Sequence, residues 1–296
     1  MTPEILNRIL EKATSECKVN GVRLFNWTEP FLHPQVDKMV ETVKKHRLRC
    51  VISTNLNTNS SPCYRRLLES GLDILRISLS AFNQEKYGKI HRGGNIANVK
   101  KNLELLLRLR EETKSRTRFF VTFHRYLSNL DQESVIAAYC KSKRILFQPI
   151  NALMLPLEKV LAYCQEASFG EICKADMGLI DSLALPLKGA LASGTKTQSE
   201  RCKLREEQMV LNWRGDVLLC CAVYDEKQFK IGNYLEKDLE TLQKARSEHK
   251  ACPFCLKCGV ANYFTYNIPD MNTLAAENIR RHFHELQEVN NAPKFF

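Results

Sequence analysis

The sequence predicts an α/β protein in which a parallel sheet precedes a small cysteine-ligated metal domain. Strand and helix signals alternate over residues 1–150, as in parallel strands joined by helical crossovers. Half of the 12 cysteines fall in the last third of the chain, between Cys202 and Cys258. The length of 296 residues fits one large α/β domain with an appendage.

The expected strands are short apolar runs rich in β-branched and aromatic residues, each bounded by polar or glycine-containing turns. They cover residues 22–27, 50–54, 74–79, 118–124 and 144–149. Helices are expected between them, over 34–47, 63–70, from 84, 96–113 and 131–142. The helix over 96–113 carries Val99, Leu103, Leu106 and Leu107 on one side, which is the periodicity of a helix packed on a sheet.

The second half of the chain changes character. Residues 151–200 mix apolar helical patterns with proline and glycine, and predict helices plus a linker. Beyond Cys202, two apolar runs flank Arg214-Gly215-Asp216, which indicates a compact hairpin. Helices are expected over 239–249 and 271–289.

Composition limits the class of protein. The net charge of +11 comes from dispersed basic runs, which fit either solvated helix faces or a basic surface that attracts an anionic partner. No aromatic-basic pattern of a nucleic-acid module is present, so a nucleic-acid partner is not expected. Neither a secretory signal nor an apolar run of about 20 residues occurs, and we expect a cytoplasmic protein without a membrane span. In that reducing compartment the cysteines are not expected to form disulfides.

Polar side chains stand where several of the expected strands end. Parallel α/β sheets place their active sites at the carboxyl ends of the strands, so these residues are candidates for binding or catalysis. The alternative is that they only cap the strand ends. The candidates are Thr28, Glu29 and Pro30, then Ser53, Asn55, Ser78 and Ser80, and finally His124 and Gln148.

The cysteines of the last third have the spacing of a metal site. Cys252, Cys255 and Cys258 form two overlapping C-x-x-C units, which turn successive thiolates toward one centre. The hairpin turn at Gly215 places Cys220 at a strand end, and Cys202 precedes the hairpin. Thiolates suit an iron–sulfur cluster or zinc, and the spacing leaves both open. A zinc-containing nucleic-acid binder is therefore one alternative.

In this order, the motifs resemble those of radical S-adenosylmethionine (SAM) enzymes with a SPASM or twitch-type auxiliary domain. The stretch 25–34 resembles the family's Gly-Gly-Glu-Pro strand end, with Thr28 in place of a glycine. Residues 52–55 and 77–80 resemble the next two strand ends, with Ser80 in place of an aspartate, and residues 87–94 also fit. The set from Cys202 and Gly215 to Cys258 resembles the auxiliary motif and favours iron–sulfur over zinc.

The resemblance implies a partial (β/α) barrel over residues 1–195, a cluster domain over 196–268 and a C-terminal helix over 269–296. It also implies that SAM is bound by Glu29 together with its neighbours at the strand ends: Thr28, Pro30, Ser53, Asn55, Ser78 and Ser80. The implied ligands of an auxiliary 4Fe-4S cluster are Cys202, Cys220, Cys252 and Cys255, with Cys258 as a substitute for one of the last pair and Cys221 as the doubtful member. A small-molecule or peptide substrate is implied, and a flavodoxin or ferredoxin as reductant.

One departure from the family concerns its C-x-x-x-C-x-x-C loop, which does not occur in this sequence. We expect that the first barrel strand and this loop are missing, as in an N-terminally truncated enzyme. The complete enzyme is expected to cleave SAM to a 5′-deoxyadenosyl radical that abstracts hydrogen from the substrate. The alternative is a non-catalytic, metal-stabilised binding protein that keeps only the auxiliary cluster.

Overall fold

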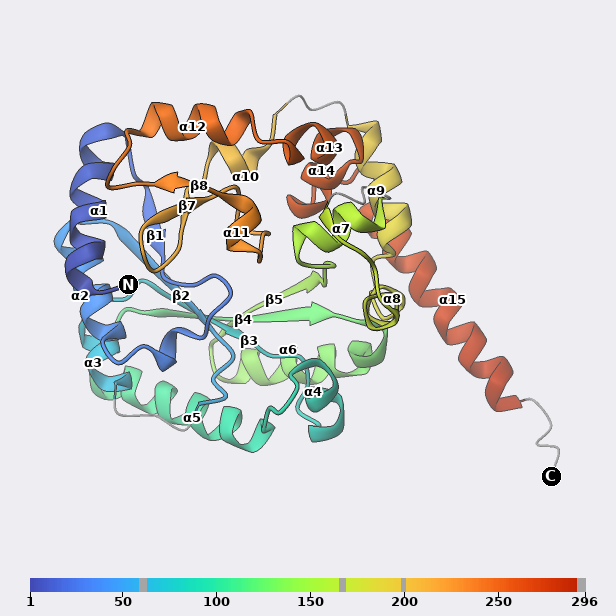
Figure 1. Ribbon diagram of the computed structural model, residues 1–296. Helices are drawn as coiled ribbons and strands as arrows, with labels where there is room; N and C mark the ends of the chain where they lie inside the picture. Colours follow the sequence, from blue (N-terminus) through green and yellow to red (C-terminus); the bar gives the residue numbers. More distant parts are fainter. Residues whose placement is uncertain (59–62, 165–168, 198–200, 292–296) are drawn as a thin grey trace.

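The first half of the chain forms a five-stranded parallel sheet with strands in sequence order, as seen in a computed structural model that describes residues 1–58, 63–164, 169–197 and 201–291. The strands are β1 (Gly21–Arg23), β2 (Arg49–Thr54), β3 (Ile74–Ser78), β4 (Arg118–Arg125) and β5 (Leu146–Asn151). Every pair of neighbours is parallel, so all carboxyl ends lie along one edge of the sheet. The sheet confirms the α/β fold class (Figure 1).

One face of this sheet is covered by helices. α2 (Val36–Lys45), α3 (Tyr64–Glu69), α5 (Ile96–Glu112) and α6 (Glu133–Ser142) lie along it, and α4 (Gln84–Ile90) precedes α5 (Figure 1). Alternate strand residues point into this layer and are buried with the helices, among them Cys50, Ile52, Leu75, Ile77, Phe119, Val121 and Phe123. Because side chains alternate along a strand, the residues between them face the other way.

The opposite face is polar and only partly buried. Ser53, Arg76, Ser78, His124 and Gln148 occupy the alternate positions on β2 to β5. Strand register sets Ser53 beside Arg76 and, one layer further along, Ser78 beside Thr122. We call this surface the inner face.

A small antiparallel sheet forms the centre of the cysteine-rich part. Its strands are β6 (Val210–Leu211), β7 (Asp216–Leu218) and β8 (Lys230–Asn233), and α1 (Pro3–Glu16) packs beside it (Figure 1). Ile9 of α1 shares an apolar cluster with Val217, Tyr234 and Leu242, and the Tyr234 hydroxyl donates to Glu16 at 2.8 Å. The remaining short helices are α10 (Lys203–Glu206), α11 (Glu226–Phe229), α12 (Leu239–Ser247), α13 (Ala251–Lys257) and α14 (Val260–Phe264).

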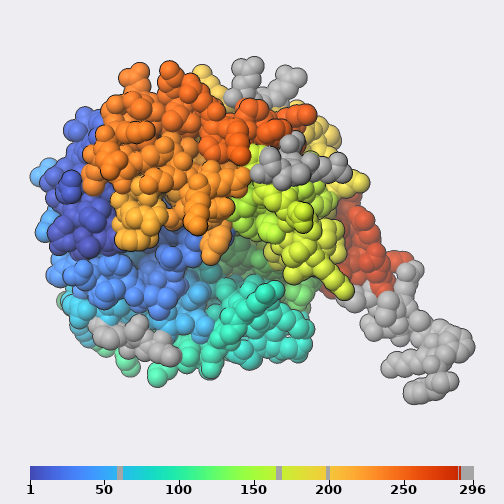
Figure 2. All heavy atoms as spheres, viewed as in Figure 1, coloured from blue at the N-terminus to red at the C-terminus, as the bar shows by residue number. Residues whose placement is uncertain are grey.

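Residues 152–197 contain helices that follow the parallel sheet in the chain and precede the small antiparallel sheet. α7 (Leu157–Tyr163), α8 (Lys174–Asp181) and α9 (Leu187–Lys196) share one apolar cluster with residues that follow β7 and with α14. The last helix, α15 (Met271–Asn291), starts against this cluster and then projects from the body (Figures 1 and 2). Asn278 fastens its first half by donating to the carbonyl oxygens of Leu183 and Ala184. Among the described residues, none of the helices has both the length and the apolar character that crossing a bilayer requires.

Two local expectations differ from the structure. The first strand covers Gly21–Arg23 rather than 22–27, because the chain leaves the sheet to place Trp27 and Glu29 in contacts with other segments. The run from Cys252 to Cys258, for which no helix was predicted, is mostly helical, as α13. Strand β8 was not expected, since Lys230–Asn233 is short and polar at both ends.

The hairpin before Cys220 is anchored by a buried carboxylate. Asp216 is 2% exposed, and its side chain contacts Lys230 at 2.8 Å and Arg214 at 3.2 Å. Burial raises its pKa, but hydrogen bonds from Lys230, Asn233, Arg214 and Asn212 outweigh burial and hold the pKa at about 2. Gly215 has φ +82°, which a turn at this point accepts readily from glycine.

Replacing this carboxylate tests whether it holds the hairpin. Asp216→Asn is expected to lower the free energy of unfolding by about 2 kcal/mol, because the charges of Lys230 and Arg214 lose their buried partner. Urea denaturation at pH 7 measures this change. Asp181→Asn, at an exposed end of α8, is the matched control, and equal stability of the two variants would contradict the anchoring role.

Candidate functional site

The carboxyl edge of the parallel sheet brings several of the predicted binding residues together. Glu29 lies in the segment between β1 and β2, directly before the short helix η1 (Pro30–Leu32). One carboxylate oxygen accepts the backbone N–H of Phe31 at 3.1 Å, and the other accepts that of Asn55 at 2.8 Å. A carboxylate offers about four acceptor positions, so Glu29 keeps acceptor capacity for an ammonium group of a ligand. Thr28 beside it is exposed, and Pro30 is buried as the first residue of η1.

Several buried polar atoms near this edge have no hydrogen-bond partner within the described ranges. They are Ser80 Oγ, Tyr87 OH, Thr122 Oγ1 and Asn151 Oδ1. Ser80 follows β3, Thr122 lies on β4 and Asn151 ends β5. Buried polar atoms are nearly always paired in folded proteins, so such a group of atoms along one edge fits a polar ligand or bound water. Because these atoms could form hydrogen bonds with a polar cofactor, the edge fits such a ligand.

A stacked pair of side chains closes one side of this edge. The rings of Tyr87 and His91, from α4 and its end, lie 4.5 Å apart at an interplanar angle of 21°. Burial lowers the pKa of His91 to about 4, and His124 contributes. Burial raises the pKa of Tyr87 to about 12, and the charge of Glu29 adds to it. Both rings are therefore neutral at pH 7. The pKa of His124 is lowered as well, by burial first and then by Arg76.

The cysteine-rich part is fixed over the same edge by the loop that follows Cys220 and Cys221. The indole N–H of Trp27 donates to the carbonyl oxygen of Val223 at 2.6 Å, and the rings of Trp27 and Tyr224 meet edge to face at 5.3 Å. Glu158 of α7 is buried and accepts the backbone N–H groups of Tyr224 and Asp225. The cysteine-rich part therefore contacts the parallel sheet at its carboxyl edge.

The predicted cysteine ligands are close neighbours in the fold. Cys202 precedes α10, Cys220 and Cys221 follow β7, and the other three belong to α13 and its end. Burial raises the pKa of the Cys255 thiol well above its usual value, and charge repulsion from four nearby thiols adds to this: those of Cys220, Cys252, Cys202 and Cys258. Thiols from three separate segments thus lie within electrostatic range of one sulfur atom.

Their arrangement is not that of ligands around a single ion. Within the described part of the chain, no three His, Cys, Asp or Glu side chains are grouped as they would be around one metal ion. Thiolates on a tetrahedral zinc lie about 3.8 Å apart, given Zn–S bonds of about 2.3 Å. The thiols here share a neighbourhood without such close grouping.

A buried cation stands among these thiols. Arg246 of α12 is 0% exposed and donates to the carbonyl oxygens of Leu219 and Gln208. Burial is the largest cause that lowers its pKa, while the thiols of Cys220, Cys202 and Cys252 act in the opposite direction. Within the described residues no carboxylate forms an ion pair with it. A buried charge needs compensation, so the surroundings of Arg246 fit a negatively charged, thiolate-ligated centre.

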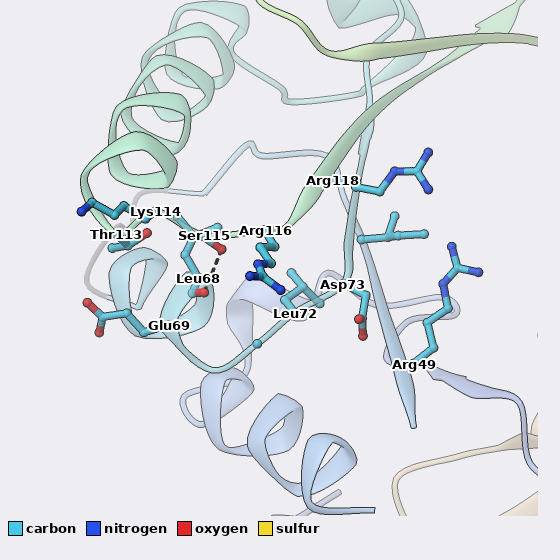
Figure 3. A pocket seen from close by; sticks show the side chains of 12 residues that line it. Arg49, Leu68, Glu69, Leu72, Asp73, Thr113, Lys114, Ser115, Arg116 and Arg118 are labelled. Carbon is cyan, nitrogen blue, oxygen red and sulfur yellow. Dashed lines mark hydrogen bonds between the residues drawn. The ribbon is translucent and has the colours of Figure 1, made fainter. Parts of the chain in front are cut away.

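A separate hollow lies away from this edge. It has a volume of about 620 Å³ and lies at the amino ends of the strands, where Arg49, Arg116 and Arg118 are among its lining residues (Figure 3). Asp73 on its wall is paired with Lys44 at 2.7 Å. Half of its lining residues are exposed, and it lies at the opposite end of the sheet from Glu29. The chemistry of the carboxyl edge therefore does not extend to this hollow.

Sequence reasoning missed Arg76 and Thr122 on the inner face and Arg246 among the thiols. For the first two a signal existed: each lies two residues from a predicted site residue on the same strand, and therefore on the same face. No sequence pattern marks Arg246, which is one basic residue on an otherwise ordinary helix.

Two family models match separate parts of the chain. Residues 1–124 match the model of the radical SAM superfamily, and residues 202–259 match the SPASM model, described as an iron–sulfur cluster-binding domain. Among solved structures, His-tagged anSMEcpe with bound AdoMet aligns with 99% of this chain and 87% of its own length, with a TM-score of 0.56 and 16% identity. Streptococcus suis SuiB bound to precursor peptide SuiA aligns with 89% of this chain and 64% of its own, with a TM-score of 0.56 and 16% identity. These structures share the fold.

A curated relative matches in sequence. A probable GTP 3',8-cyclase of Methanococcus maripaludis is 26% identical over 160 residues, which is 54% of this chain and 49% of that protein. The chain thus spans about half the length of the curated relatives it matches.

The neutral histidines at the carboxyl edge predict a loss of stability in mild acid. An unfolded histidine binds its proton near pH 6.5, whereas folded His91 does so at about 4, so stability is present above the first value and is lost as the pH falls toward the second. The expected loss at pH 5 is on the order of 1–2 kcal/mol. Urea denaturation between pH 7 and 5 measures it. His91→Gln should flatten this dependence, whereas His284→Gln, at an exposed position, should not; equal slopes would contradict the assignment.

Proposed function

We propose that this chain is part of an enzyme that acts on its substrate by radical chemistry. The premise is that the chain belongs to the radical SAM superfamily and carries a SPASM-type iron–sulfur domain. In a complete enzyme, SAM and a reducing cluster, whose C-x-x-x-C-x-x-C motif does not occur in this sequence, would supply a 5′-deoxyadenosyl radical for hydrogen abstraction from a substrate. The contribution of this chain is to hold the cofactor, to exclude water and to orient the substrate below the auxiliary domain.

The cofactor-binding part of the proposal rests on the carboxyl edge. Glu29 is proposed to accept the ammonium group of the methionine moiety, since both its oxygens are fixed in place by Phe31 and Asn55 and keep acceptor capacity. Ser80 supplies a buried hydroxyl without a partner. The supporting polar residues are proposed to be Thr28, Pro30, Ser53, Asn55 and Ser78.

The auxiliary cluster is proposed to be a 4Fe-4S cluster ligated by Cys202, Cys220, Cys252 and Cys255. Cys258 is the substitute for one of the last pair, and Cys221 is left out because it is adjacent to Cys220 in the chain. The observation that carries this part is the buried guanidinium of Arg246 among the thiols, which a negatively charged centre would compensate. A neutral, metal-free pocket would leave that charge without an anionic partner.

Partners follow from the same chemistry. We propose a small molecule or a peptide as substrate and a flavodoxin or ferredoxin as the source of electrons. We propose a reducing compartment such as the cytoplasm, in which thiolates remain available as cluster ligands.

Metal analysis of the anaerobically purified chain tests the cluster. About four iron and four sulfide per chain are expected at the auxiliary site, with loss of most of both in Cys255→Ser, because that thiol has four thiol neighbours. Cys17→Ser, at an exposed position on the end of α1, is the control and should keep its iron. Zinc without sulfide in the wild-type chain would reject the proposal.

Arg246 gives a second test that does not require a substrate. Removing its positive charge should make the reduced, more negative cluster less favourable, so Arg246→Gln is expected to shift the midpoint potential to a more negative value. Arg246→Lys keeps the charge and should stay close to the wild type. Potentiometric titration followed by electron paramagnetic resonance measures both variants, and identical potentials in all three proteins would show that Arg246 does not act on the cluster.

A further inference from the structure

The inner face of the parallel sheet contains an arginine without an acidic partner. Arg76 occupies the middle of β3 and is partly buried. Its guanidinium donates one hydrogen bond, to Gln148 Oε1 at 3.3 Å. Within the described ranges no carboxylate forms an ion pair with it. A guanidinium has five N–H donors in a planar fork, so most of the donors of Arg76 are available to a ligand.

The neighbours of Arg76 increase this excess of positive charge. Arg23 lies on the same face of the sheet, two strands away, because β1 pairs with β2 and β2 with β3 in register. Burial is the main cause that lowers the pKa of Arg76, and the charge of Arg23 adds to it. The inner face therefore presents two cationic side chains to one space.

The nearby groups that could offset this charge do not do so. His124 lies further along β4 and tends to the neutral form. Glu29 lies one layer nearer the carboxyl edge, and its oxygens are directed to the backbone of Phe31 and Asn55. Gln148 is neutral. Neither the partly buried Arg76 nor the exposed Arg23 forms an ion pair with a carboxylate among the described residues.

A second, independent feature points to a ligand here. Thr122 is 8% exposed, and its hydroxyl has no hydrogen-bond partner among the described atoms. Strand register places Thr122 between Ser78 and Gln148, on the face that carries Arg76. Arg76 has no anionic partner and the Thr122 hydroxyl has no hydrogen-bond partner among the described residues. A bound anion on this face would pair with both.

We propose that the inner face binds an anionic group of the substrate, a carboxylate or a phosphate, through the guanidinium of Arg76. Gln148 holds the guanidinium in place, and the Thr122 hydroxyl donates to the same group. Arg23 adds long-range attraction. This assignment rests on the proposed function and names the class of substrate for that site. Arg76 starts one strand layer, about 7 Å, deeper than the contact between Glu29 and Asn55, and Thr122 lies level with that contact, so the anion lies between the two layers.

The same chemistry could be met by the carboxylate of SAM, so the experiment separates the two sources. The probe is inorganic phosphate, titrated calorimetrically into the anaerobically purified full chain at constant ionic strength, with and without saturating SAM. Phosphate is expected to bind in both conditions, because the anion site lies deeper than Glu29. Displacement of phosphate by SAM, with weaker SAM binding in Arg76→Met, would overturn the assignment to substrate.

Variants locate the bound phosphate. Arg76→Met is expected to weaken phosphate binding by at least about tenfold, since a charge-assisted hydrogen-bonded pair is lost. Arg116→Met, at the hollow on the opposite end of the strands, should leave it unchanged. Equal affinity in Arg76→Met and the wild type, or a loss in Arg116→Met, would overturn the proposal.

Two further measurements keep the test decisive. Thr122→Val preserves shape and removes only the hydroxyl, so a severalfold weaker affinity is expected even if Arg76→Met folds poorly. Iron and sulfide content, measured on the same samples, reports on the cluster separately. If the wild-type chain contains the cluster but does not bind phosphate, the anion site alone is refuted, whereas a wild-type chain without the cluster would refute the proposed function.

Discussion

The hydrogen bond from the Trp27 indole to the Val223 carbonyl determines how the two halves of this protein meet. Trp27 belongs to the loop that leaves β1, and Val223 follows the cysteine pair at the end of β7. The bond spans 196 residues of sequence, and Glu158 reinforces it by holding the next two backbone N–H groups. Because Trp27 lies two residues before Glu29 and Val223 two residues after Cys221, the contact brings the cysteine pair close to the carboxyl edge of the sheet.

Arg246 among the thiols and Arg76 on the inner face are both arginines without a carboxylate partner among the described residues. Arg246 is wholly buried beside thiols, and Arg76 is partly buried beside neutral polar groups. An arginine placed without a carboxylate costs stability unless an anion is supplied from outside the chain. Both positions are explained when the missing anions are a thiolate-ligated cluster and a substrate group. The arginine and carboxylate at Asp216 show the opposite solution, in which the chain itself supplies both charges to hold the hairpin.

Much of the architecture could be predicted because local sequence carries it. The strands β2 to β5 have β-branched and aromatic runs, and the helix over 96–113 shows its apolar stripe, so both were expected close to their actual bounds. The end of β1 was misjudged, since Phe25 to Trp27 have strand propensity but long-range contacts take the chain out of the sheet. No helix was predicted for the cysteine run, which forms the helix α13.

The sequence by itself determined the α/β class, the family resemblance and the identity of the cysteines and strand-end residues, because periodicity, spacing and motif order are properties of the chain alone. Only the tertiary structure decided which of these residues meet, and which unmarked ones join them. Arg76, Thr122 and Arg246 acquire meaning from strand register and burial, since a charge or hydroxyl is significant only when its surroundings leave it without a partner.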